Sequence, residues 1–294
     1  MPKSMMLLVN PNAGKGGYKS SLAEILEVFC QNDVLPTVYF TRAAGEAPAL
    51  VRENVANYDF IVCLGGDGTL SEVVNGMMQA ENKRPIGYIP LGTANDVAKT
   101  LGLSNRPVQA ARDIIAGKLF PFDVGQFGSS FFTYVAAFGA FTEVSYGTPQ
   151  EAKHALGHLA YMLEGMKSIP KLDHYKAIVE YDDGALEGDF IFGAVTNSTS
   201  IAGLLKLDSD NVNLSDGMFE VLLIKMPQDI VELTEIINSV LSNKFDGENV
   251  LFLKSSEVRI LFEKPVAWTR DGEDGGRHRD VMIFNHPSAV NLIV

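Results

Sequence analysis

Cysteine is nearly absent from this chain of 294 residues, which contains only Cys30 and Cys63. Cys30 falls in a segment with helical periodicity and Cys63 in an apolar run typical of a strand, so we expect neither a disulfide framework nor a zinc cluster. Among the histidines, only His154 and His158 are spaced as neighbours on a helix, and no third ligand is nearby. These absences favour a reducing, cytoplasmic environment.

Positive charge is also scarce, with 24 Lys and Arg residues against 36 Asp and Glu residues and a formal net charge of -12. Proteins that bind nucleic acid gain most of their affinity by neutralising phosphates with Lys and Arg. We therefore expect no nucleic-acid partner.

Long hydrophobic runs are missing as well. The sequence contains no stretch of about eighteen apolar residues, so we predict no transmembrane segment, and the start MPKSMMLLVN is too short and too weakly apolar for a signal peptide. Repeats and low-complexity segments are absent too, while 46% of the residues are hydrophobic. This composition is typical of a globular protein, and its length fits two domains.

Residues 1–126 alternate short apolar runs with segments of helical periodicity, which predicts βαβ units and a doubly wound parallel α/β domain. The expected strands are Met5 to Val9, Thr37 to Thr41, Phe60 to Leu64, Ile86 to Ile89 and Leu119 to Val124. The expected helices are Ser20 to Cys30, Glu46 to Ala56, Leu70 to Ala80, Asn95 to Leu101 and Pro107 to Ala116. Ligands bind such sheets outside the carboxyl ends of the strands.

Residues 127–286 are rich in strand patterns and turn signals, which predicts an antiparallel β-sandwich or barrel-like domain. We expect strands within SSFFTYVAAFGAF, YKAIVEYDDG, EGDFIFGAVTN, GMFEVLLIKM, EVRILFE and VMIFN, a hairpin turn at Asp183-Gly184, and helices over Gln150 to Ser168 and Asp229 to Ser242. The last apolar run, Val290 to Val294, fits either domain, and residues 287–294 are a candidate strand that returns to the first.

The stretch Leu64-Gly65-Gly66-Asp67-Gly68-Thr69 leaves an expected strand and enters an expected helix. Glycines at such a turn let the backbone come close to a ligand, and the N–H groups at the helix start favour phosphate. Asp67 would face that phosphate favourably only across a divalent cation. The alternative is an ordinary turn in which Asp67 caps a helix.

Two further turns with glycine, NPNAGKGG from Asn10 and PLGTAND from Pro90, follow other expected parallel strands. The first of these, NPNAGKGG, is neither a Walker loop nor a dinucleotide fingerprint. Lys15 could reach a phosphate, while Thr93 and Asn95 could simply cap the next helix. Because all three turns lie at the carboxyl edge of the same sheet, we expect them to converge on one ligand site.

Two acidic turns occur in the second half. Asp271-Gly272-Glu273 offers a carboxylate that could accept a proton from a hydroxyl, or it is a solvated acidic turn. Asp216-Gly217 is either a plain turn or, with nearby carbonyl groups, a site for a hard cation.

Taken in order, NPNAGKG, YFTRAAGEA, GGDGT, PLGTANDVA, FDVG, LSDGMFEV and DGE resemble the bacterial lipid kinases related to the soluble diacylglycerol kinases, over nearly the whole chain. GGDGT alone also marks NAD kinases and phosphofructokinase-like folds, but PLGTAND followed by a late DGE favours the lipid kinases.

The resemblance implies ATP and Mg²⁺ as cofactors, a nucleotide domain like that of NAD kinase and phosphofructokinase, and a β-rich domain for a lipid acceptor. It implies that Glu273 accepts the proton, with Asp271 close by. Asp67 and Asp123 would join a water and Mg²⁺ network, and Asn213, Asp216 and Met218 would hold a structural Mg²⁺. The nucleotide would be lined by Asn10, Asn12, Ala13, Gly14, Lys15, Gly16, Thr41, Gly65, Gly66, Asp67, Gly68, Thr69, Leu70, Ser71, Thr93 and Asn95.

The sequence departs from the family pattern at Gly139 to Val144 and around Ile201 to Gly203, both in the half that should receive the acceptor. The expected function is Mg²⁺-dependent transfer of the ATP γ-phosphoryl group to a lipid hydroxyl, by a cytoplasmic protein that meets the membrane transiently; a homodimer is compatible with the sequence. The alternatives are a kinase of a soluble acceptor such as NAD and a nucleotide- or lipid-sensing protein without catalysis.

Overall fold

The computed structural model describes residues 2–139, 172–198, 200–201, 205–206, 213–242, 244–245 and 247–294. The chain divides into two compact units. Unit 1 contains Met1–Val124, Ser130–Thr133 and Pro287–Val294, and unit 2 contains Gly125–Ser129 and Tyr134–His286. The strands β5 (Leu119–Phe127) and β15 (Glu273–Ile293) each contribute residues to both units.

Unit 1 is built on a parallel sheet with the strand order β2-β1-β3-β4, which the end of β15 extends. The strands are β1 (Lys3–Val9), β2 (Val34–Phe40), β3 (Phe60–Gly65) and β4 (Ile86–Pro90). All neighbouring pairs are parallel, including Leu292 and Ile293 of β15 against β4. The four carboxyl ends therefore lie along one edge of the sheet.

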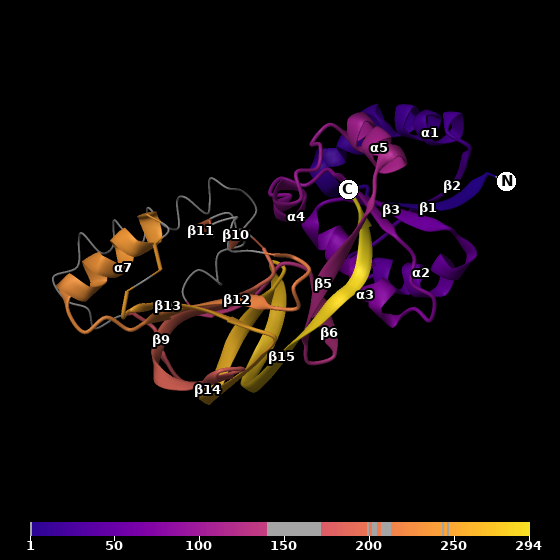
Figure 1. The fold of residues 1–294 in the computed structure, drawn as a ribbon. Helices are drawn as coiled ribbons and strands as arrows, with labels where there is room; N and C mark the ends of the chain where they lie inside the picture. Colours follow the sequence, from indigo (N-terminus) through magenta and orange to yellow (C-terminus); the bar gives the residue numbers. More distant parts are fainter. Residues whose placement is uncertain are drawn as a thin grey trace. The chain divides into compact units, whose positions relative to one another are not determined.

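Helices cover both faces of this sheet (Figure 1). α1 (Leu22–Gln31) and α5 (Pro107–Ala116) lie on one face, and α2 (Ala47–Asn54) and α3 (Asp67–Gln79) lie on the other. The remaining helical segments are η1 (Ala13–Ser20), η2 (Val55–Asn57) and α4 (Asp96–Thr100). Covering both faces explains the near-continuous apolar runs of the strands, because neither face of the sheet is left to water.

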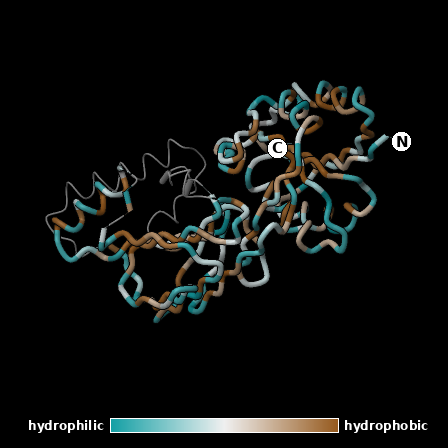
Figure 2. Tube along the Cα trace, viewed as in Figure 1, coloured by the Kyte–Doolittle hydropathy of each residue, from teal (hydrophilic) through white to brown (hydrophobic). Residues whose placement is uncertain are grey.

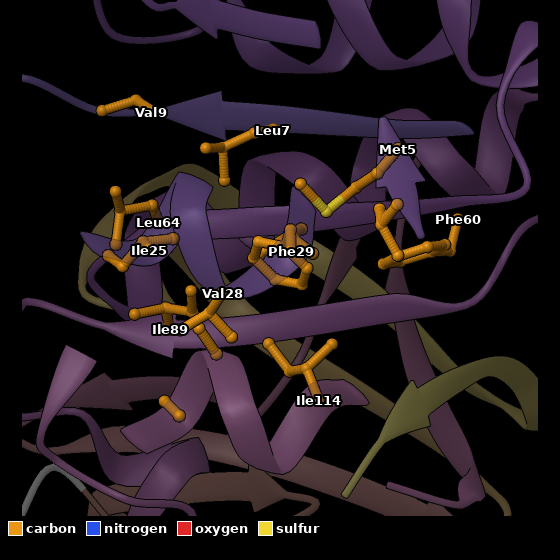
Figure 3. Close-up of a cluster of buried hydrophobic side chains, with 14 residues drawn as sticks. Met5, Leu7, Val9, Ile25, Val28, Phe29, Phe60, Leu64, Ile89 and Ile114 are labelled. Carbon is orange, nitrogen blue, oxygen red and sulfur yellow. The ribbon is translucent and has the colours of Figure 1, made fainter. Parts of the chain in front are cut away.

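The core on the α1 and α5 side contains every second residue of β1. Met5, Leu7 and Val9 of β1 belong to one cluster with Ile25 and Phe29 of α1 (Figure 3), and all five side chains are fully buried. The intervening residues of β1 face the opposite helices and are buried as well. Burial of an aliphatic side chain of this size stabilises the fold by about 1.5–3 kcal/mol.

Unit 2 is rich in antiparallel strands. Its strands include β7 (Val135–Gly139), β8 (Tyr175–Tyr181), β9 (Gly184–Thr196), β10 (Ser200–Ile201), β11 (Leu205–Lys206), β12 (Phe219–Lys225), β13 (Val250–Ser255) and β14 (Glu257–Arg270). The short strand β6 (Ser130–Phe132) belongs to unit 1. β12 lies between β9 and β13, β7 pairs with β9 and β14, and β8 pairs with β9 and β14. The helix α7 (Ile230–Ser242) follows β12.

An aromatic cluster fills the core of unit 2. Trp268 of β14 lies 5.2 Å from Phe127 and 5.0 Å from Phe138, measured between ring centroids, and Phe138 lies 4.9 Å from Phe262. Edge-to-face and tilted contacts at such distances add about 0.5–1.5 kcal/mol per pair to the effect of burial. In Figure 2, the hydrophobic stretches of the trace follow the strands.

The expected elements of the first half are found with shifted ends. Only α5 has the predicted bounds, while α3 begins at Asp67 instead of Leu70 and β2 ends at Phe40 instead of Thr41. The predicted start of α3 is wrong because glycine was taken as a sign of a turn, whereas Gly66 is the N-cap and Gly68 already lies in the first turn of the helix.

In the second half, the predicted β8–β9 hairpin exists, but Tyr181 pairs with Gly184, so Asp182-Asp183 forms the turn and the predicted position is one residue late. The α7 prediction is confirmed to within one residue. We did not predict β13 or the length of β15. The predicted helix over residues 150–168, His154 and His158 lie outside the described residues. Within the described part of the chain, no helix is both long and apolar enough to cross a membrane.

Candidate functional site

Asn10 joins the first two glycine turns of unit 1. Its side-chain nitrogen donates to Thr69 Oγ1 at 2.9 Å, its side-chain oxygen accepts the Asn12 amide at 2.9 Å, and its own amide donates to the Leu64 carbonyl at 3.0 Å. One amide side chain thus fixes the turn after β1 to the turn after β3.

Glycines let the third turn join the other two. Gly14 has a φ of +56°, and a Cβ at this position would lie 2.3 Å from the Leu91 carbonyl oxygen. A Cβ at Gly92 would lie 2.8 Å from the Gly66 Cα. These approaches are closer than any side chain permits, so the turns after β1, β3 and β4 meet through their backbones. The predicted convergence of the three turns is therefore seen within unit 1.

The start of α3 lies in the middle of this cluster. Because the helix begins at Asp67, the amides of its first turn belong to the residues Asp67, Gly68 and Thr69. Amides of a first helical turn have no partner in their own helix, and with the helix dipole they favour an anion. The donor chemistry of this edge fits a polyphosphate.

The Asp67 carboxylate is buried and joins the second turn to the third. Its two oxygens accept the amides of Asp96 at 2.9 Å and Val97 at 3.3 Å, at the start of α4. The alternative interpretation of the third turn makes Thr93 or Asn95 the cap of this helix. Asn95 stands at the N-cap with a φ of +49°, but its side chain instead donates to the Gly92 carbonyl and accepts from the Tyr88 hydroxyl. Asp67 from α3 caps α4.

Two ionisable groups in this region have perturbed pKa values. Burial raises the pKa of the Cys63 thiol, which lies on β3, and the negative charges of Glu72 and Asp67 raise it further. Burial also raises the pKa of Asp96, although the Lys99 ammonium at 3.5 Å partly offsets the rise. Cys63 is consequently a packing residue and not a nucleophile.

The other residues expected to line the nucleotide lie around the same edge. Thr41 is buried just after β2, and its amide donates to the Val9 carbonyl at 3.0 Å. Thr93 is exposed in the third turn. Lys15 lies in η1, and its side chain is outside the described part of the structure. The remaining residues of the expected nucleotide lining lie in three elements. Ala13 and Gly16 belong to η1, Gly65 ends β3, and Leu70 and Ser71 belong to α3.

Asp123 is fully buried on β5, and its Oδ1 accepts the Ser288 amide at 2.6 Å. Ser288 has a φ of +50°, so this hydrogen bond secures an uncommon backbone conformation within β15. The structure thus gives Asp123 a part in holding β15 against β5.

The acidic turn of unit 2 is a tight hairpin between β14 and β15. Asp271 and Gly272 both have positive φ, +48° and +82°, as a two-residue hairpin turn requires. Asp271 is buried, and its Oδ1 accepts the amides of Tyr134 at 3.0 Å and Val135 at 3.1 Å. Glu273 is exposed at the first position of β15. The Asp271 carboxylate anchors the turn, and Glu273 is the exposed acid beside it.

Comparison with known proteins now identifies the group of proteins to which this chain is related. Residues 4–127 match the model of the diacylglycerol kinase catalytic domain. A diacylglycerol kinase of Bacillus subtilis is 32% identical over 277 residues, which cover 93% of this chain and 91% of that protein. The chain belongs to the diacylglycerol kinase family. By family it is an ATP-dependent lipid kinase.

Two further similarities agree with this family. A diacylglycerol kinase of Staphylococcus carnosus is 31% identical over 279 residues, with 94% of this chain and 90% of that protein covered. The crystal structure of a diacylglycerol kinase from Bacillus anthracis superposes with a TM-score of 0.79 over 99% of this chain and 96% of that one, at 24% identity. The fold is therefore shared along essentially the whole chain.

The residues that the family resemblance assigned to a structural Mg²⁺ lie together in unit 2 of this kinase. Asp216 Oδ1 accepts the Met218 amide at 3.0 Å, and Asn213 Oδ1 accepts the Ser215 amide at 3.2 Å. A carboxylate with backbone carbonyls is a donor set that suits a hard cation. Across the described ranges, no group of three or more His, Cys, Asp and Glu side chains is arranged to hold a metal ion.

Two residues that sequence reasoning missed accompany Asp216. The Lys254 ammonium lies 3.5 Å from Asp216 and 3.5 Å from Glu220, which is fully buried on β12. Burial raises the pKa of Glu220 to about 7, although the attraction of Lys254 opposes that rise. Nothing local in the sequence marks this cluster, because β12 and β13 bring its members together.

Glu72 is the third residue that the sequence did not reveal. It lies on α3, and its two oxygens accept the amides of Gly45 at 2.8 Å and Ala47 at 3.2 Å. The only signal available was an acid shortly after GGDGT, which is common on any helix surface.

Proposed function

We propose that this protein transfers the γ-phosphoryl group of ATP to the hydroxyl group of diacylglycerol in the presence of Mg²⁺. The observation that carries the proposal is the joining of three glycine turns around the start of α3 in unit 1. Family membership supplies the class of reaction, and the named relatives supply the acceptor. Since diacylglycerol is held in bilayers, the reaction takes place at a membrane surface.

In this proposal, unit 1 holds the phosphate donor. The first-turn amides of α3 bind phosphate oxygens, Asn10 and the glycines keep the three turns in place, and Lys15 adds a positive charge. Thr41, Thr93 and Asn95 line the rest of the nucleotide. Such a site accelerates transfer mainly by positioning the reactants and by stabilising the charge on the phosphoryl group.

Mg²⁺, when bound, neutralises charge on the phosphoryl oxygens. Asp67 and Asp123 are the carboxylates proposed to hold it through water. A carboxylate has about four acceptor sites, so Asp67 can keep the two α4 amides and accept a water as well. Asn213, Asp216 and Met218 are proposed to hold a second, structural Mg²⁺ in unit 2.

Glu273 is the proposed base. It accepts the proton of the lipid hydroxyl while the hydroxyl oxygen forms a bond to the γ-phosphorus, and the bond from that phosphorus to the β,γ-bridging oxygen breaks to release ADP. Asp271 is less suited to this step, because its carboxylate is buried and accepts two backbone amides. We assign Asp271 the role of positioning the turn that carries Glu273.

The test is a phosphotransfer assay with ATP and Mg²⁺, using diacylglycerol in mixed micelles and NAD as competing acceptors. We expect phosphorylated lipid from the wild type, detected by mass spectrometry. Glu273→Gln should lower kcat by about 10²- to 10⁴-fold, the usual contribution of a general base, while ATP affinity is kept. Asp271→Asn should lower kcat less, since both amides donate to one oxygen, which asparagine retains.

The matched control is Glu263→Gln, which removes the charge of another glutamate of unit 2 that is 68% exposed. It should leave kcat unchanged. Phosphorylation of NAD but not of diacylglycerol would reject the acceptor, and a Glu273→Gln enzyme as fast as the control would reject the base.

A further inference from the structure

Glu72 links two parts of unit 1 that the sequence separates. It lies in the second turn of α3, downstream of the residues proposed to bind phosphate. Both of its carboxylate oxygens accept backbone amides, from Gly45 at 2.8 Å and from Ala47 at 3.2 Å. These amides belong to the segment that follows β2 and includes Thr41.

The start of α2 depends on this contact. Ala47 is the first residue of α2, and the N-cap residue, Glu46, makes no side-chain hydrogen bond to the helix. The Glu46 carboxylate is instead engaged by Arg42, whose amide donates to it at 2.6 Å and whose Nε donates at 2.8 Å. Glu72 therefore does from α3 what an N-cap normally does locally, and its negative charge stands at the positive end of the α2 dipole.

One helical turn further along α3, Gly76 lets the two helices touch. A Cβ at Gly76 would lie 2.6 Å from the Pro48 carbonyl oxygen and 2.7 Å from Val51 Cβ. α2 is thus pressed against α3 directly below the Glu72 contact. At its other end, the segment is held by the hydrogen bond from the Thr41 amide to Val9 on β1. Residues 41–47 are consequently fixed at both ends.

We propose that Glu72 is a positioning residue for nucleotide binding, which sets residues 41–47, and with them Thr41, relative to the start of α3. This inference rests on the proposed function, since it gives Thr41 a part in holding the nucleotide. Asp67 and Glu72 then have parallel roles. Each is an acid on α3 that accepts two amides at or near the start of another helix, α4 after β4 for Asp67 and α2 after β2 for Glu72.

The test compares Glu72→Gln with the wild type. Glutamine has one acceptor oxygen where the carboxylate has two. One of the two backbone amides therefore loses its acceptor and faces the NH₂ group of glutamine, which is itself a donor. We expect the KM for ATP to rise about tenfold, the cost of one charged hydrogen bond, with kcat unchanged. Hydrogen exchange at Gly45 and Ala47 should become faster.

A double-mutant cycle with Thr41→Val separates positioning from a general effect on stability. If Glu72 acts through Thr41, Thr41→Val should weaken ATP binding clearly in the wild type and much less in the Glu72→Gln background. The matched control is Glu53→Gln on α2, at a side chain that is 65% exposed, which removes the same charge and should leave ATP affinity and exchange unchanged.

Faster exchange at Gly45 and Ala47 with an unaltered KM and strictly additive effects would overturn the proposal, because Glu72 would then only cap α2. The Kd for ATP, which is measured separately and without any lipid acceptor, should rise by the same factor as the KM. A wild type that binds ATP but phosphorylates no lipid therefore contradicts the proposed function, whereas equal ATP affinity of Glu72→Gln and the control contradicts this inference.

Discussion

At the scale of single residues, the meeting of the three turns in unit 1 depends on glycines at positions that disfavour a side chain. Gly14 combines a positive φ with a backbone neighbour at the place of its absent Cβ, while Gly16 has a positive φ of +80° and nothing within 4 Å of that place. The two glycines share a conformational requirement, but only Gly14 is in contact with the third turn.

This difference gives a matched pair of substitutions. Gly16→Ala should lower the free energy of unfolding by about 1–2 kcal/mol, the cost of a left-handed conformation for an L-residue. Gly14→Ala bears the same cost and also forces the Leu91 carbonyl away, for a total of about 2–5 kcal/mol. Urea denaturation measures both changes. Equal losses for the two variants would show that the close approach to Leu91 has no energetic weight.

At the scale of elements, one aspartate of unit 2 joins the β8–β9 hairpin turn to the connection between β13 and β14. Asp182, in the β8–β9 turn, accepts the amides of Ser256 at 2.7 Å and Glu257 at 3.2 Å, and its own amide donates to Ser255 Oγ at 3.0 Å. These partners lie where β13 ends and β14 begins. The contact fixes the β8–β9 turn to the β13–β14 turn.

Asp182 should make stability depend on pH. Burial raises the pKa of Asp182, but hydrogen bonds from Ser256, Ser255 and Glu257 outweigh it and hold the pKa below the ordinary value of 3.8. Its contribution is therefore present above a pH of about 4 and is lost as the pH falls through the lower, folded-state pKa.

Asp182→Ala should accordingly destabilise unit 2 by about 1 kcal/mol at pH 7 and by less near pH 2. Asp183→Ala, which removes a charge from the exposed neighbour in the same turn, serves as the control. Denaturation curves at the two pH values give the comparison. A loss for Asp182→Ala that is the same at both would mean that the carboxylate charge plays no part.

At the scale of the whole molecule, the chain forms two compact units whose residues interleave along the sequence, since β5 and β15 contribute to both. The roles proposed for them differ: unit 1 offers backbone amides for phosphate, and unit 2 offers the carboxylate of Glu273. The chain has a net charge of -12, so the protein as a whole repels a polyanion. In this proposal, the backbone amides of unit 1 are therefore needed as local hydrogen-bond donors for phosphate.

Hydrogen exchange with a non-hydrolysable ATP analogue and Mg²⁺ should therefore show a defined pattern of protection. We expect slower exchange at residues 10–16, 65–71 and 91–97 of unit 1, where amides gain phosphate partners or are held by those that do. Inorganic phosphate at equal ionic strength is the control. Protection restricted to unit 2 would contradict the assignment of the donor site.

The sequence by itself determined the elements whose signals are local. Short apolar runs between segments of helical periodicity located the parallel strands of unit 1, and the helical period located α5 and α7 closely. The order of motifs predicted the family, and the family comparisons confirm it. Local signals also predicted the coarse fold, an α/β part followed by a β-rich part, because side-chain periodicity follows from the geometry of helix and strand.

Only the tertiary structure decided which groups meet. The sequence offered Asp67 as a ligand or a cap, and the fold makes it the cap of α4, a helix that begins far along the chain. Glu72 on Gly45 and Lys254 between Asp216 and Glu220 could not be inferred, because each contact joins residues on different elements. Periodicity records which side of an element is buried, whereas the partner across the interface is set by packing between elements.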